Sequence, residues 1–118
     1  MSKTNFKRGD IITVCLNPVM GKELKGEYRP ALVLSDSKFH NLVGVMMIAP
    51  ITQGNAILAR NNGFAVTLSG TGCKTQGVVV PYQIRTIDFK ERKAKKVESV
   101  PEYILSEVQD IVEAILRD

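Results

Sequence analysis

Cationic, hydroxyl and amide side chains recur at the ends of apolar segments in this chain of 118 residues. Arginine stays protonated at neutral pH and can hold two oxygens in its fork, and a threonine hydroxyl can donate one hydrogen bond. Groups of these kinds suit a phosphate. The set comprises Arg29, Thr52, Gln53, Arg60, Gln83 and Arg85 at predicted strand ends, with Lys22, Glu23 and Lys25 in one loop.

Motifs for other common chemistries are absent from the sequence. It contains no GxSxG, Walker loop, HExxH or dinucleotide fingerprint, so common hydrolases, NTPases and redox enzymes find no support. The single histidine, His40, excludes a His-rich metal site and a catalytic pair of histidines, and we interpret it as structural. Cys15 and Cys73 lack a CxxC neighbour, so we expect reduced structural thiols, no metal and no cofactor.

Each polar residue taken alone also has a plain structural interpretation. Arg29 can be a surface charge that ends a strand, and Thr52 can be a turn residue that bonds its own backbone. Taken together, the segments "RPALVLS" and "APIT" favour a functional interpretation. Both segments meet a strand corner, and adjacent strands could bring the two corners together.

The elements that must position these residues are predicted to be mostly strands. Runs rich in β-branched and apolar residues, bounded by turns, cover residues 11–16, 31–36, 43–52, 64–68, 77–81 and 82–88. Residues 17–29 predict a long loop, a length that is often functional. Pro30 favours extended backbone at Arg29, and Pro50 cannot donate to a strand ladder, so pairing should loosen near Thr52.

One amphipathic helix is predicted at the C-terminal end. Apolar residues recur at helical spacing from Ile104 to Leu116, Pro101 suits a first turn, and Ser99 or Val100 is the expected cap. The apolar face of this helix should close the barrel or support a dimer. The pattern as a whole predicts a mainly β fold: a strongly bent antiparallel sheet or partly open barrel with a C-terminal helix.

Charge is distributed unevenly. Residues 98–118 carry one arginine and six carboxylates, a net charge of −5, so residues 1–97 carry +9 of the total of +4. A basic body indicates a polyanionic partner, although solvated lysines explain it equally well, and we interpret 92–96 as a solvated turn. With no secretory signal and no apolar stretch near the roughly 20 residues of a membrane span, we expect a single cytoplasmic domain, residues 1–118.

Several segments in order resemble the MazF/PemK/Kid family of bacterial toxins, in particular its ChpB-like members. They are "RGDIITV" at 8–14, "NPVMGKELKGEYRPALVLS" at 17–35, "APITQGN" at 49–55, "GFAVTL" at 63–68, "TQGVVVPYQIRTID" at 75–88 and Arg92. The resemblance implies an SH3-like, twisted antiparallel barrel with short helices and a homodimer. It also implies metal-independent, sequence-specific cleavage of single-stranded RNA, and a cognate antitoxin that covers the RNA groove. This activity would stop translation by cutting mRNA.

The resemblance assigns the family's active-site arginine and threonine to Arg29 and Thr52. The RNA 2′-OH would then be the nucleophile, leaving a 2′,3′-cyclic phosphate and a 5′-OH. Tyr82 and Val80 replace a carboxylate and an arginine that some members use as base and acid, so that mechanism does not transfer. Glu23 is our candidate base, with a solvated loop charge as the alternative.

Bases and phosphates of single-stranded RNA should be contacted by stacking, edge hydrogen bonds and cations. The predicted RNA-binding residues are Lys22, Lys25, Gln53, Tyr82, Gln83 and Arg85. Two other functions stay open: a non-catalytic inhibitor like the CcdB gyrase poisons, which share this kind of barrel, and an inactive member that only binds RNA.

Overall fold

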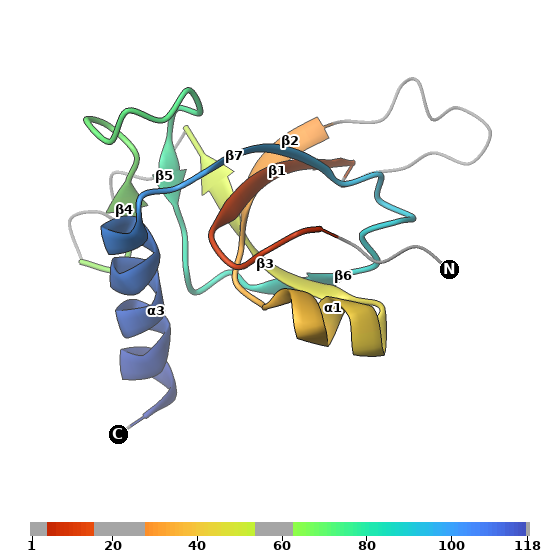
Figure 1. Cartoon of the computed structure of the whole chain (residues 1–118). Coiled ribbons are helices and arrows are strands. Elements are labelled where there is room, and N and C mark those ends of the chain that lie inside the picture. Colours follow the sequence, from red (N-terminus) through yellow and green to blue (C-terminus); the bar gives the residue numbers. More distant parts are fainter. Residues whose placement is uncertain (1–4, 16–27, 54–62, 118) are drawn as a thin grey trace.

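The structure, a computed structural model, describes residues 5–15, 28–53 and 63–117. Seven strands in these ranges form one antiparallel sheet in the order β4-β5-β3-β2-β1-β7, and β6 also pairs with β3 (Figure 1). The strands are β1 (Asp10–Cys15), β2 (Tyr28–Val33), β3 (Met46–Thr52), β4 (Val66–Thr67), β5 (Val78–Val79), β6 (Arg85–Ile87) and β7 (Lys95–Ser99). The helices are α1 (Ser37–Val43) and α3 (Glu102–Leu116). The prediction of a mainly β fold with a C-terminal helix is confirmed.

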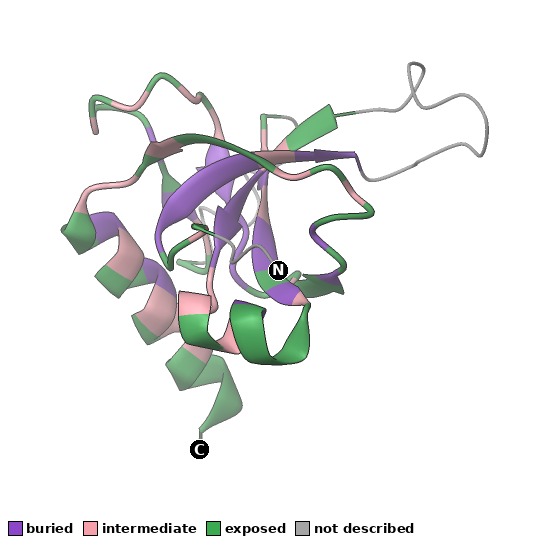
Figure 2. Cartoon of the chain, turned by 45° about the vertical axis from the view of Figure 1, so that its right-hand side comes forward, coloured by how far each residue is buried: buried purple, intermediate pink, exposed green. Residues whose placement is uncertain are grey.

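The central strands are buried on both faces of the sheet. Successive side chains along a strand point to opposite faces. Accordingly, Ile11 and Leu32 belong to one buried cluster, whereas their neighbours Ile12 and Ala31 belong to another. Figure 2 shows this burial as purple ribbon along the middle of the sheet. Burial on both faces explains why these strands appear in the sequence as continuous apolar runs.

Helix α3 covers the first cluster with its apolar face. Ile104 and Val108 are buried there, and Ile111 is partly buried against the same cluster. The helix begins after Pro101, which has no side-chain cap bond, so our expectation of a cap at Ser99 or Val100 is wrong. Near the C-terminal end, Leu116 keeps 77% of its surface exposed. The helix therefore closes the barrel as far as Ile111 and leaves its last turn exposed.

Helix α1 lies beside the second cluster and is fixed at both ends. Asp36 accepts a hydrogen bond from the Phe39 backbone N–H at 2.8 Å, which caps the first turn. Gly44, at φ 87°, ends the helix in the left-handed conformation that glycine adopts readily. Arg8 also binds Asp36 at 3.3 Å, and so ties the segment before β1 to the helix.

Two elements differ from the sequence prediction. The apolar pattern of the sequence does not predict the helix at residues 37–43, because His40 is the only buried residue of this helix. Residues 92–96 are only partly a turn, since Lys95 and Lys96 begin β7. β7 is an edge strand with mostly exposed side chains, so its sequence lacks the alternation that marks a half-buried strand.

No helix within the described ranges is long and apolar enough to cross a membrane.

Candidate active site

Arg29 and Thr52 lie at the same end of neighbouring strands. The ladder between β2 and β3 pairs Val33 with Ile48 and ends at the pair Ala31–Pro50. Arg29 is the second residue of β2 and Thr52 the last residue of β3, so both lie just beyond that last pair. In Figure 1 the start of β2 and the tip of β3 diverge at this end of the sheet. Arg29 and Thr52 thus border the place where the two strands separate.

Alternation along the strands places both residues on the same face. Arg29 is two residues from Ala31, and Thr52 is four residues from Ile48. Ala31 and Ile48 belong to the second buried cluster, so Arg29 and Thr52 point to the face that this cluster occupies. α3 covers the other face.

Pro30 explains why the ladder stops here. The Leu34 N–H bonds to the Met47 carbonyl at 2.9 Å, so Leu34 directs its backbone groups toward β3. Every second residue of a strand does the same, which means that Pro30 also faces β3. A proline has no N–H to donate, so the pair that would follow Ala31–Pro50 lacks one of its hydrogen bonds.

Pro50 interrupts the other edge of β3 in the same way. The Val80 N–H bonds to the Pro50 carbonyl at 3.0 Å, so Pro50 faces the edge where β5 and β6 pair. β6 pairs with residues Met46 to Ile48 of β3, and β5 pairs with Ile51 and Thr52. The neighbour of β3 on this edge therefore changes from β6 to β5 around Pro50. The turn that connects β5 and β6 lies next to Pro50 and carries Tyr82 and Gln83.

Three of the described RNA-contact candidates, Gln53, Tyr82 and Gln83, lie near this end of β3, whereas Arg85 lies farther along the strand. Gln53 follows β3 directly and is exposed. Tyr82 (48% exposed) and Gln83 project from the turn that is fastened to Pro50, where the Gln83 N–H bonds to the Val80 carbonyl at 3.3 Å. Arg85 pairs with Ile48, so it lies on the same face as Thr52, about 13 Å away along β3.

Three predicted site residues, Lys22, Glu23 and Lys25, lie outside the described residues, as does Arg60. The described site therefore offers guanidinium, hydroxyl, amide and phenol groups. No carboxylate belongs to β2, β3 or the 80–85 segment, so the described part supplies no general base there. The described ranges also contain no group of three or more His, Cys, Asp or Glu residues that could hold a metal ion.

His40 lies at the opposite end of β3 from Thr52. The Met47 N–H bonds to Ser35 Oγ at 2.9 Å, and Ser35 Oγ lies 2.7 Å from His40 Nε2. His40 Nδ1 lies 3.1 Å from the Phe6 carbonyl, which can only accept, so Nδ1 carries the hydrogen. Burial lowers the pKa of His40 below its ordinary value, against weaker opposing effects of the Phe6 carbonyl and nearby carboxylates. These contacts agree with a structural role.

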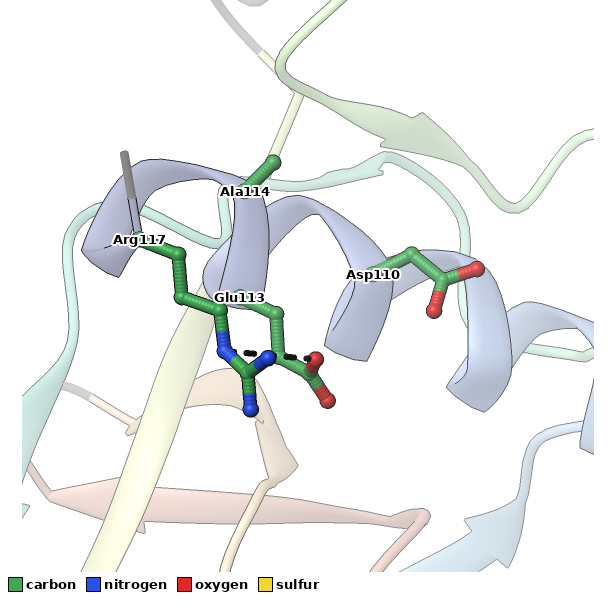
Figure 3. Close-up of a pocket in the computed structure, with 4 residues that line it drawn as sticks. All are labelled: Asp110, Glu113, Ala114 and Arg117. Atoms are coloured by element: carbon green, nitrogen blue, oxygen red, sulfur yellow. Dashed lines mark ion pairs between the residues drawn. The ribbon is translucent and has the colours of Figure 1, made fainter.

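Two surface hollows lie along α3, away from Arg29 and Thr52. One, of about 410 Å³, is lined by Asp110, Glu113, Ala114 and Arg117, and Arg117 Nε lies 4.0 Å from Glu113 (Figure 3). Its carboxylates would repel a phosphate. The other, of about 340 Å³, is mostly apolar and is lined by Leu34, Met47, Ile84, Gln109, Val112, Glu113 and Leu116.

Sequence reasoning missed the residues that continue the row of Thr52 across the sheet. Thr52 pairs with Val78, and Val78 pairs with Thr67 on the next strand, so the three side chains share one face. Gly77, which lies against the Thr52 carbonyl, and Glu98, which accepts hydrogen bonds from Lys74 and Thr75, were missed as well. Contacts between segments far apart in the chain reveal these residues, and no local sequence pattern contains such contacts.

The fold and this site define a class: small, curled β-sheet proteins that carry an arginine and a threonine where two central strands part. Comparison with known proteins identifies the family within that class. Residues 7–116 match the PemK-like, MazF-like toxins of type II toxin–antitoxin systems. The chain belongs to this family.

Similar proteins carry matching names. The chain is 41% identical to the endoribonuclease PemK of Escherichia coli over 97% of this chain and 84% of that protein. It is also 41% identical to the endoribonuclease toxin ChpB of E. coli K12, over 96% of this chain and 99% of that one. A MazE–MazF crystal structure from Deinococcus radiodurans matches with a TM-score of 0.79 and 29% identity, over 94% of this chain and 95% of that one. The predictions of family and fold are confirmed.

Proposed function

We propose that this protein is the toxin of a type II toxin–antitoxin system and acts as a sequence-specific endoribonuclease on single-stranded RNA. The observation that carries the proposal is the family match over residues 7–116. It is supported by relatives named as endoribonucleases at 41% identity. Cutting mRNA would stop translation and growth.

In the proposed reaction, Arg29 and Thr52 bind the scissile phosphate. The RNA 2′-oxygen attacks phosphorus, the bond from phosphorus to the 5′-oxygen breaks, and the products are a 2′,3′-cyclic phosphate and a 5′-OH. The Arg29 guanidinium, which is exposed at the strand end, would neutralise charge that develops on the phosphate oxygens. The Thr52 hydroxyl would donate a hydrogen bond to one of them. This mechanism requires no metal ion.

The 2′-OH proton must go to a base, and the leaving 5′-oxygen must receive a proton. Glu23 is the proposed base. Two facts support it: β2, β3 and the 80–85 segment hold no carboxylate, and Tyr82 and Val80 stand where some relatives have an acid and an arginine.

RNA binding is proposed to follow the face that Thr52 and Arg85 share. Gln83 and Gln53 offer an amide donor and acceptor for a base edge, and Tyr82 offers a ring for stacking. Arg85 would meet a phosphate, as would Lys22 and Lys25 in the preceding loop. The carboxylates of α3 lie on the helix that covers the other face of the sheet.

Two protein partners are proposed. A cognate antitoxin would cover the RNA-binding face, which is supported by the MazE–MazF complex among the matching structures. A second copy of the chain would pack on the C-terminal end of α3, which the barrel leaves exposed. This is supported by Ile115 and Leu116, which are 47% and 77% exposed, beside the apolar hollow at Met47 and Ile84.

The test is to incubate the purified protein with a long single-stranded RNA in EDTA and to map the ends. Discrete cuts with 5′-OH termini are expected, together with their loss in Arg29→Ala and their retention in Arg117→Ala, which removes an exposed charge at the C-terminal end of α3. RNA that stays intact but bound would indicate an inactive RNA-binding member. Intact, unbound RNA would favour a non-catalytic inhibitor of the gyrase-poison type.

A further inference from the structure

The loop between β4 and β5 is held by a carboxylate from the opposite edge of the sheet. Glu98 belongs to β7, the edge strand beyond β1, whereas the loop belongs to the β4 edge. Glu98 Oε1 accepts the Lys74 backbone N–H at 3.0 Å. Its Oε2 accepts both the Thr75 N–H and the Thr75 hydroxyl at 2.8 Å. One side chain thus joins the two edges of the curled sheet.

These three bonds favour the charged carboxylate. Partial burial alone would raise the pKa of Glu98, but the donors from Lys74 and Thr75 outweigh it, so the pKa is lowered below its ordinary value. A carboxylate that accepts several backbone N–H groups makes stronger hydrogen bonds than a neutral side chain does. The loop is therefore held by the ionised form.

The held loop leads directly to Thr52. Gly77, two residues after Thr75, has φ 122° and lies against β3, where an added Cβ would be 2.8 Å from the Thr52 carbonyl oxygen. The Leu68 N–H bonds to the Gly77 carbonyl at 3.0 Å, and the next residue, Val78, pairs with Thr52. The end of the loop and the end of β3 are thus in direct backbone contact.

The strand pairing of Thr52 lies on the side of β5. The ladder between β2 and β3 ends at the pair Ala31–Pro50, whereas Thr52 pairs with Val78 of β5. β5 has two residues, so its position depends on the segments that flank it. Whatever fixes β5 therefore contributes to the orientation of Thr52.

We propose that Glu98 is a positioning residue for Thr52: it fixes the loop at Lys74 and Thr75, and the loop fixes β5 and the end of β3. The inference rests on the proposed function for its catalytic consequence, but the structural link can be measured without RNA. Glu98 would not touch the substrate. Its effect would reach the phosphate only through Thr52.

The test compares Glu98→Gln with Glu107→Gln, which makes the same charge change on the exposed face of α3. The glutamine amide replaces one acceptor oxygen by a donor group, so at least one of the three bonds is lost. By amide hydrogen exchange we expect about ten-fold faster exchange at Leu68 and Val80 in Glu98→Gln only. Leu34, which bonds to Met47 at the far end of β3, should be unchanged.

RNA cleavage gives the second measurement. Glu98→Gln should lower kcat about ten-fold or more with little change in KM, because a small displacement of a catalytic group slows chemistry more than binding. Thr75→Val, which removes one bond, should have a smaller effect, and Thr75→Ser should behave as the parent. Glu107→Gln should cut RNA normally.

Each outcome decides one of the two proposals. Unchanged exchange at Leu68 and Val80, or equal acceleration at Leu34, would overturn the positioning role. Faster exchange with unchanged kcat would also overturn it. If the parent protein cuts no RNA while exchange changes as expected, the structural link stands and the nuclease proposal fails.

Discussion

Gly77→Ala is the substitution whose effect can be calculated most directly from the structure. At φ 122° an alanine is strained, at a cost of about 1–3 kcal/mol. In addition, the new methyl group would lie 2.8 Å from the Thr52 carbonyl oxygen and 3.2 Å from Ile51 Cγ2. Relieving such overlap in a packed region costs about a further 1–3 kcal/mol. We therefore expect the free energy of unfolding to fall by roughly 2–6 kcal/mol.

Gly70→Ala is the matched control. Gly70 has φ 78°, and an added Cβ there would meet nothing within 4 Å. This variant should lose only the conformational part, about 1 kcal/mol. The difference between the two variants therefore contains the contacts of the new methyl group with Thr52 and Ile51, together with any extra strain at φ 122°.

Urea unfolding measures both variants. With a urea dependence of about 1–3 kcal/mol per M, Gly77→Ala should lower the midpoint by about 1 M or more relative to Gly70→Ala. RNA cleavage should fall in Gly77→Ala even where the protein is folded, because β5 is pushed away from Thr52. Equal midpoints for the two alanine variants would refute the reasoning that Gly77 packs against the end of β3.

Three further predictions concern single side chains. Arg29→Ala should reduce cleavage about 10²- to 10³-fold with an unfolding free energy within about 0.5 kcal/mol of the parent, and cleavage at the parental rate would remove Arg29 from the mechanism. Glu23→Gln should slow the single-turnover rate more than it weakens RNA binding, whereas equal single-turnover rates would exclude Glu23 as the base. For His40, whose folded pKa is lowered by burial, the unfolded chain takes up the proton first. The contribution of neutral His40 to the free energy of unfolding should therefore be fully present above a pH of about 6.5, and it should be lost as the pH falls below that value. Urea titrations from pH 8 to 5 should show this loss in the parent and not in His40→Gln, and a flat parental profile would contradict the burial effect.

The central strands were predictable because their chemistry is local. Residues 11–15, 31–33 and 46–51 are runs bounded by turn residues, and because both faces of the sheet are buried, every position in them except Thr13 is apolar. Helix α3 was predictable for the same reason, since Ile104 and Val108 recur at helical spacing. Helix α1 and β7 were not, because their residues are mainly exposed and follow no period.

The residues of the candidate site also differ in whether local sequence could predict them. Arg29 and Thr52 could be singled out from a strand corner, a proline and the family resemblance. Glu98 and Gly77 could not, because their importance comes from the register of segments that are far apart in the chain. A glutamate in "KKVES" has no feature that predicts its hydrogen bonds to Thr75, 23 residues earlier.

Pro30, beside the site, has a kinetic consequence. Since Pro30 offers no amide hydrogen to β3, β2 and β3 are already separated beside Thr52, while β3 stays paired with β5. An incoming nucleotide or inhibitor would not have to break main-chain bonds before it could enter, so no slow unzipping step should precede association. A residue with an amide hydrogen at position 30 would allow β2 and β3 to pair as far as Thr52, and these two strands would then have to separate before each encounter.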